Sequence, residues 1–280
     1  MKTAILKAPA KINLCLKIIG KRSDGYHDIY TIFRKISLFD ELEINVRPGP
    51  NNINLSCSDP SLPSNRNNLA WRAAERFLAE SGLDGSISIK LNKKIPAGAG
   101  LGGGSSDAAA VLNGLNKIHG EPLDMDDLME MGKGLGADVP FFVAHCNAAI
   151  GTGTGTILHP VQLDNSYYIL IWPGFAVSTK WAYENLVLTS NKETTIFGPG
   201  QGFHKVFLWQ NDLEKAVFAR YPVLHEIKAC LKRAGAINTL MSGSGSVIFG
   251  EFPDKETAIK GLSLLPMDQP WKIYVVNGLQ

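Results

Sequence analysis

The sequence lacks the features that mark several large classes of protein. The chain has 280 residues and only 4 cysteines, with no C-x-x-C spacing, at Cys15, Cys57, Cys146 and Cys230. This pattern favours reduced thiols over a disulfide framework. No apolar run reaches the roughly 20 residues that a membrane span requires, and the first residues alternate between apolar and polar instead of forming a secretory signal. We therefore expect a soluble, cytoplasmic protein.

An excess of one charge is also missing. The chain has 28 basic and 26 acidic residues, a formal charge of +2, and the two signs are mixed along its length. No basic stripe is present for nucleic acid or a membrane surface, although a small anionic substrate remains compatible. The histidines are scattered without the spacing of metal ligands, so we expect no resident metal.

The elements that are present predict an α+β protein with two domains, 1–155 and 156–280. Strand-forming residues cluster at 3–19 and 30–46, and a short strand is expected at 86–91. Asn68 and Asp124 stand where they could cap helices that end at Gly82 and Leu135. Towards the C-terminus we expect strands at 168–172, 238–241, 246–252 and 272–276 and helices at 213–233 and 255–265.

The strongest functional signal is the glycine-rich stretch from Pro96 to Ala110, which lies between a strand and an amphipathic helix. Glycines let backbone N–H groups approach phosphate oxygens, and the helix start adds further unpaired donors with partial positive charge. Ser105 and Ser106 could add hydroxyl ligands for phosphate or for a nucleotide-bound magnesium ion. This pattern favours an ATP site.

Two other interpretations of the glycine stretch remain open from the residues alone. It could be a flexible connection between strand and helix, or a dinucleotide-binding turn, because Gly98, Gly100 and Gly103 match G-x-G-x-x-G. The dinucleotide interpretation needs an acidic residue at the end of a second strand, and Glu121 and Asp124 fall at a helix junction instead.

Three further stretches contain residues that could belong to an active site. Lys11 and Asn13 share one face of a strand, although a strand lysine is often an exposed edge charge. Asp138, in Gly-Ala-Asp-Val-Pro, could receive a proton during phosphoryl transfer, or it could simply cap a turn or helix. The residues 240–247 form a second small-residue loop that could close over an active site or be a tight strand-to-strand turn.

These four stretches, in this order, resemble the GHMP kinase superfamily over nearly the whole chain. The Arg22-Ser-Asp-Gly-Tyr-His27 turn and the triple glycine followed by two serines resemble a branch that acts on a cytidine diphosphate-linked methylerythritol. The resemblance implies a two-domain GHMP kinase fold with an active-site cleft between the domains, and phosphorylation of the 2-hydroxyl of that substrate by ATP with Mg²⁺.

The resemblance also implies roles for individual residues. Asp138 would be the general base and Lys11 would orient it. ATP would be held by Pro96, Gly98, Gly100, Leu101, Gly102, Gly103, Gly104, Ser105 and Ser106, with Asn68 near the adenine. The substrate would contact Asn13, Tyr26, His27 and a second aromatic wall, for which Tyr183 is the better match and Trp181 the rival.

Three competing functions follow from the same residues. The chain could be a GHMP kinase for homoserine, mevalonate or a sugar, a non-catalytic binding module, or a nucleic-acid-binding protein. The Gly-Tyr-His turn argues against the first, the presence of both Lys11 and Asp138 against the second, and the mixed charge against the third. Oligomeric state has no signal in the sequence, and Thr189 to Gln201 has no functional interpretation.

Overall fold

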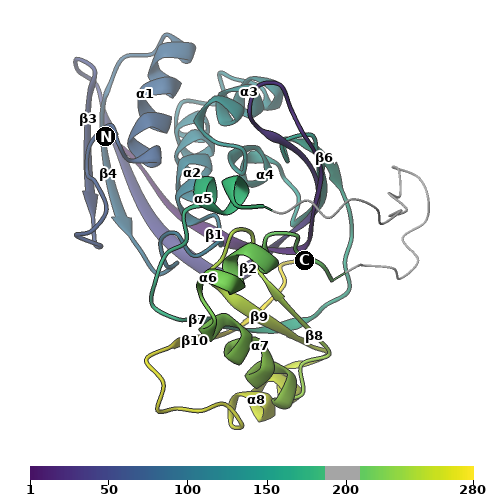
Figure 1. Cartoon of the computed structure of the whole chain (residues 1–280). Helices are drawn as coiled ribbons and strands as arrows, with labels where there is room; N and C mark the ends of the chain where they lie inside the picture. The colour runs from purple at the N-terminus through teal and green to yellow at the C-terminus, as the bar shows by residue number, and fades with distance from the viewer. Residues whose placement is uncertain (187–208) are drawn as a thin grey trace. The chain divides into compact units, whose positions relative to one another are not determined.

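The computed structural model describes residues 1–186 and 209–280 (Figure 1). The stretch Thr189 to Gln201 lies outside the described residues. The chain forms two compact units: unit 1 comprises Met1–Ala10, Leu38–Ala97 and Gly102–Cys146, and unit 2 comprises Lys11–Ser37, Gly98–Leu101 and Asn147–Gln280. These units interleave along the chain, whereas the predicted domains are consecutive, and the boundary near residue 155 stays a prediction.

Unit 1 contains a sheet covered by helices. The second part of β2 (His27–Arg47) pairs antiparallel with β4 (Ser86–Asn92), and β4 pairs parallel with β3 (Asn52–Cys57). In β4 the isoleucines and leucine at alternate positions are buried while the residues between them are polar, as a strand with one covered face requires. α1 packs against α2 and β3, and α2 also packs against α3 and α4 (Figure 1).

The helices of unit 1 begin and end largely where the sequence predicts. α1 (Leu69–Ser81) is capped by the Asn68 side chain and ends at Gly82, which has a φ of 65°. α2 is Gly103–Ile118, and α3 (Met125–Leu135) starts with a capping box between Asp124 and Asp127. α4 (Val139–Val143) was not predicted, because its proline suggests a break, yet proline is tolerated in the first turn of a helix.

Unit 2 contains the part of β1 that follows Ala10 and the part of β2 that precedes Leu38, together with the C-terminal half of the chain. The first part of β2 pairs with β5 (Ala148–Thr152), and β5 pairs with β6 (Ile157–Pro160). A separate antiparallel sheet has the order β10-β7-β9-β8. Its strands are Tyr167–Trp172 (β7), Asn238–Met241 (β8), Ile248–Phe252 (β9) and Lys272–Asn277 (β10).

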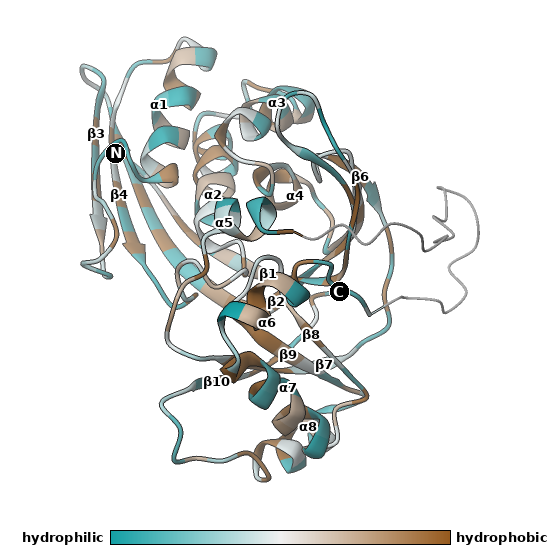
Figure 2. Ribbon diagram, in the orientation of Figure 1, coloured by the Kyte–Doolittle hydropathy of each residue, from teal (hydrophilic) through white to brown (hydrophobic). Residues whose placement is uncertain are grey.

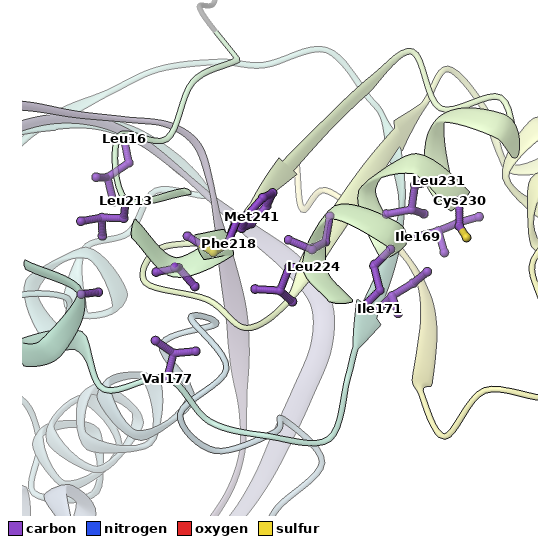
Figure 3. Close-up of a cluster of buried hydrophobic side chains, with 14 of the residues drawn as sticks. Leu16, Ile169, Ile171, Val177, Leu213, Phe218, Leu224, Cys230, Leu231 and Met241 are labelled. Atoms are coloured by element: carbon purple, nitrogen blue, oxygen red, sulfur yellow. The ribbon is translucent and has the colours of Figure 1, made fainter. Parts of the chain in front are cut away.

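Four helices supply much of the core of unit 2, and the last two of them along the chain pack against this second sheet. They are α5 (Thr179–Glu184), α6 (Glu214–Arg220), α7 (Val223–Arg233) and α8 (Lys255–Leu262). α7 buries Leu224, Ile227 and Leu231, which recur every three or four residues and belong to the same hydrophobic cluster as Ile169 and Ile171 of β7. Figure 3 shows Leu224 and Leu231 together with these two isoleucines. The strands of this sheet are mainly hydrophobic, whereas α7 and α8 also carry hydrophilic residues (Figure 2).

Most of the predicted strands and helices are present in the structure, which also contains several elements that were not predicted. β1 (Lys2–Lys21), β7, β8 and β10 match their expected ranges, whereas β3, β5, β6 and α5 have no counterpart among the predicted elements. Within residues 1–186 and 209–280, no helix has the length and apolar character needed to cross a membrane.

Candidate active site

Lys11 and Asn13 form a buried polar chain in unit 2. Lys11 is 4% exposed and Asn13 is 1% exposed, so the alternative of an exposed edge lysine is wrong. The Lys11 ammonium donates to Asn13 Oδ1 at 2.6 Å, and Asn13 Nδ2 donates to Thr31 Oγ1 at 2.8 Å. Thr31 in turn donates to the Cys15 carbonyl at 2.6 Å. The shared strand face that the spacing predicts is therefore confirmed, and the chain of hydrogen bonds fixes the direction of both side chains.

The same lysine lies beside both small-residue loops. The Lys11 backbone N–H donates to the Leu101 carbonyl of the first loop at 2.9 Å. A Cβ atom placed on Gly243, in the second loop, would lie 3.3 Å from both Lys11 Nζ and Asn13 Oδ1. Three of the four stretches found in the sequence thus meet in unit 2.

The two loops are bonded to each other through Gly100 and Ser242. Ser242 Oγ donates to the Gly100 carbonyl at 2.8 Å, and Val247 N donates to the Ala99 carbonyl at 3.2 Å. Gly100 has a φ of 79°, and a Cβ atom there would come within 2.0 Å of the Ser242 carbonyl oxygen. Glycine is therefore required at position 100 for packing as well as for any approach of phosphate.

Asn211 holds the second loop in place, although no sequence motif singles it out. Its Nδ2 donates to the Met241 and Gly243 carbonyls at 2.8 and 2.7 Å, while its Oδ1 accepts from Leu213 N at 2.9 Å. The side chain is 5% exposed, so every bond it makes lies away from solvent. The loop from Ser242 to Ser246 is therefore buried and held in a fixed position beside Lys11. Its closure over a bound nucleotide stays a prediction.

The start of α2, in unit 1, offers free backbone donors. Gly102 precedes the helix and makes no side-chain cap, so the N–H groups of the first turn have no partner inside the helix. Ser106 Oγ is also buried without a hydrogen-bond partner in the described residues. Unpaired donors and a hydroxyl at a helix N-terminus are what an anionic phosphate chain needs.

Asp138 and Asn68 also belong to unit 1. Asp138 is partly buried and directly precedes α4, and its side chain makes no capping hydrogen bond, so the capping alternative is wrong for this helix. A Cβ atom on Gly136 would lie 3.8 Å from Ser105 Oγ, which brings the Gly-Ala-Asp turn beside the start of α2.

Asn68 accepts from Ala70 N at 2.9 Å and donates to the Pro63 carbonyl at 2.8 Å, which confirms its predicted capping role. Its place near adenine stays a prediction.

An aromatic pair in unit 2 joins residues far apart in the sequence. The rings of His27 and Tyr183 lie 5.2 Å apart and are tilted by 33°. Burial, and then the charge of Lys21, lower the pKa of His27, which favours a neutral imidazole with one donor and one acceptor. Tyr26, the next residue along the turn, is 65% exposed.

Trp181 packs against residues other than His27, namely Arg220 and Tyr221. The Arg220 guanidinium lies 4.4 Å from the centre of the Trp181 ring, and Tyr221 meets that ring edge-on at 6.3 Å. Of the two candidates for the second aromatic wall, Tyr183 is therefore the one that faces His27.

Lys11 belongs to unit 2 and Asp138 to unit 1. The predicted pairing of these two side chains stays a prediction.

Comparison with known proteins agrees with this set of motifs. Residues 68–145 match the family model of the GHMP kinases N terminal domain, and residues 204–263 match that of the GHMP kinases C terminal. Proteins named 4-diphosphocytidyl-2-C-methyl-D-erythritol kinase match throughout: one from Geotalea daltonii is 40% identical over 100% of both chains. Another, from Syntrophotalea carbinolica, is 42% identical over 96% of this chain and 97% of that protein.

The chain belongs to the 4-diphosphocytidyl-2-C-methyl-D-erythritol kinase family of the GHMP kinases. A crystal structure of 4-(cytidine 5'-diphospho)-2C-methyl-D-erythritol kinase superposes with a TM-score of 0.81 at 33% identity, covering 99% of this chain and all of the other. A homoserine kinase from Cytophaga hutchinsonii superposes with a TM-score of 0.72 at 19% identity, over 98% of this chain and 94% of the other, and so shares the fold. The predicted α+β GHMP kinase fold is confirmed.

Proposed function

We propose that this GHMP kinase transfers the γ-phosphoryl group of ATP to the 2-hydroxyl of 4-diphosphocytidyl-2-C-methyl-D-erythritol, in the non-mevalonate route to isoprenoid precursors. The observation that carries the proposal is the match of about 40% identity over the full length of proteins with that name. A kinase that acts on homoserine or mevalonate has no need of a base-reading pocket, so the His27–Tyr183 pair supports the cytidine substrate over those alternatives.

Asp138 is the proton acceptor for the substrate hydroxyl. Phosphoryl transfer needs the acceptor oxygen aligned with the γ-phosphate and a group that receives its proton as the new bond forms. Support comes from the nearness of its turn to Ser105 at the start of α2. Lys11 orients the reacting groups, and Asn13 contacts the substrate.

The glycine-rich loop binds the triphosphate. The backbone N–H groups from Gly98 to Gly104 and the first turn of α2 receive the phosphate oxygens, with Ser105 and Ser106 as hydroxyl ligands. Mg²⁺ arrives with ATP. Bound there, it neutralises phosphate charge, and the unpartnered Ser106 hydroxyl suits it as an oxygen ligand.

Tyr26, His27 and Tyr183 recognise the cytosine. The exposed Tyr26 ring and the Tyr183 ring can stack on a base, and a neutral His27 can both donate to and accept from its Watson–Crick edge. The four free cysteines and the use of ATP support a cytoplasmic location.

Identification of the product tests the proposal. The purified protein is incubated with ATP, Mg²⁺ and 4-diphosphocytidyl-2-C-methyl-D-erythritol, and the product is examined by phosphorus NMR. The carbon that carries the 2-hydroxyl also carries the methyl group and no hydrogen, so the expected phosphomonoester signal shows no three-bond coupling to a carbinol proton. A phosphomonoester signal split by such protons would place the phosphate on another hydroxyl and contradict the proposal.

A further inference from the structure

The turn between β1 and β2 is fixed in shape without support from a hydrophobic core. Every residue from Lys21 to Tyr26 is exposed. The backbone of the turn closes on itself, because Arg22 N donates to the Tyr26 carbonyl at 2.8 Å and Gly25 N donates to the Arg22 carbonyl at 3.2 Å. Gly25 has a φ of 86°, a left-handed conformation that glycine adopts without strain. A turn this exposed needs polar contacts of its own to keep one conformation.

The Arg22 guanidinium supplies these contacts by holding two carboxylates at once. Its Nε donates to Asp24 Oδ2 at 3.0 Å and its Nη2 lies 2.9 Å from the same oxygen, while its Nη1 donates to Asp28 Oδ1 at 3.1 Å. Asp24 Oδ1 in turn accepts from Tyr26 N at 3.1 Å. The hydrogen bond from Arg22, and then the one from the Tyr26 backbone, lower the pKa of Asp24. One planar fork therefore ties the start of the turn to its middle and to the start of β2.

The same contacts fix the backbone of Tyr26 while its ring stays in solvent. Both the N–H and the carbonyl group of Tyr26 are hydrogen-bonded inside the turn, yet the residue is 65% exposed. The next residue, His27, lies against the Tyr183 ring at 5.2 Å. An exposed aromatic ring on a fixed backbone can receive a flat ligand with little further loss of conformational freedom.

We propose that Arg22, Asp24 and Asp28 are positioning residues that set this turn for cytosine, with Arg22 acting through the two carboxylates and not by contact with the substrate. This inference rests on the proposed recognition of cytosine by Tyr26 and His27. Exposed ion pairs add little to the stability of a fold. This pair fixes a binding turn in advance, so less conformational entropy is lost when the substrate binds.

Loss of the fork is expected to weaken the discrimination between cytosine and uracil. The two bases exchange a donor and an acceptor at the edge that a neutral His27 contacts. In a loosened turn the imidazole meets that edge in several orientations, so the match with cytosine counts for less. The fold and the phosphoryl transfer step do not depend on the turn and should remain intact.

Calorimetric titration with cytidine diphosphate and uridine diphosphate measures this discrimination. A saturating non-hydrolysable ATP analogue with Mg²⁺ is present, so that the ATP site is occupied. We expect Arg22→Ala to bind cytidine diphosphate about tenfold more weakly than the wild type does, because Tyr26 and His27 must then be ordered on binding. Uridine diphosphate should lose less affinity. In steady-state kinetics the KM for the cytidine substrate should rise, while kcat and the KM for ATP stay unchanged.

Further variants test how Arg22 acts. Arg22→Lys keeps the charge but lacks the planar fork, so it should restore only part of the affinity; full restoration would show that charge alone suffices and would overturn the positioning role. Asp24→Ala should cause a loss similar to that of Arg22→Ala, and the double variant should be no weaker than the weaker single one. Asp24→Ala also gives the same test if Arg22→Ala does not fold.

Lys133→Ala is the matched control. It removes an ion pair with Glu130 on α3, and its side chain is 45% exposed, against 41% for Arg22. This variant should match the wild type in every measurement.

The outcomes separate this inference from the function on which it rests. Equal losses of affinity for the two diphosphates in Arg22→Ala would place the guanidinium on the diphosphate that they share and overturn the inference, and so would unchanged affinity for both. A wild-type protein that binds the two diphosphates equally well would contradict the proposed cytosine pocket, and the inference with it.

Discussion

Substitution of Gly100 by alanine tests the packing of the two loops. The residue has a φ of 79°, and an alanine Cβ would lie 2.0 Å from the backbone oxygen of Ser242, where real Cβ contacts are not closer than 3.0 Å. Left-handed backbone costs about 1–2 kcal/mol for alanine, and relief of an overpacked contact costs about 1–3 kcal/mol more. We expect Gly100→Ala to lower the free energy of unfolding by about 2–5 kcal/mol.

The same change should impair catalysis. One loop must move by about 1 Å for the new Cβ atom to reach an ordinary contact distance, and such a displacement of binding groups costs on the order of a hundredfold in kcat/KM. Urea denaturation and steady-state kinetics measure the two effects.

Gly82→Ala is the matched control for Gly100→Ala. Gly82 has a φ of 65°, but a Cβ atom there would meet nothing within 4 Å. It should therefore carry only the backbone penalty, about 1–2 kcal/mol, with unchanged kinetics. If the two variants have equal stability and equal kcat/KM, the loops do not depend on the contact between Gly100 and Ser242.

Three further predictions concern single side chains. Asp138→Asn should lower kcat severely with little change in ATP affinity, because positioning survives while proton acceptance does not; near-normal turnover would remove Asp138 from the chemistry. Tyr183→Ala should raise the KM for the cytidine substrate more than Trp181→Ala does, and the reverse order would assign the aromatic wall to Trp181. Burial raises the pKa of Asp107 in α2 to about 7, which gives a stability that is fully present below its unfolded pKa and is lost as the pH rises through 7; denaturation from pH 4 to 8 should show this loss in the wild type and not in Asp107→Asn.

Local signals made much of the fold predictable. The Asn68 and Asp124 caps, the glycine after α1 and the alternation along β4 each depend on a few consecutive residues. α4 was missed because the proline that suggests a break stands in the first turn, where it is tolerated. β3 was missed because its outward residues are polar and its support comes from pairing with β4.

Contacts between distant residues set the limit of prediction at the candidate site. Lys11 and Asn13 are two positions apart, so their shared strand face could be inferred. Lys93 and its ion-pair partner Asp40 are separated by 53 residues, and Asn211 and Gly243 by 32. No local pattern distinguishes such an asparagine or lysine from a surface residue, because only the folded chain brings its partner close.

The most direct test of the proposed function is ADP formation by the purified protein with ATP and Mg²⁺, offered 4-diphosphocytidyl-2-C-methyl-D-erythritol, homoserine, mevalonate or galactose. Turnover with the cytidine compound alone is the predicted result. Turnover with one of the other alcohols in its place would keep the GHMP kinase fold and contradict the substrate, and no turnover with any of the four would contradict the kinase activity itself.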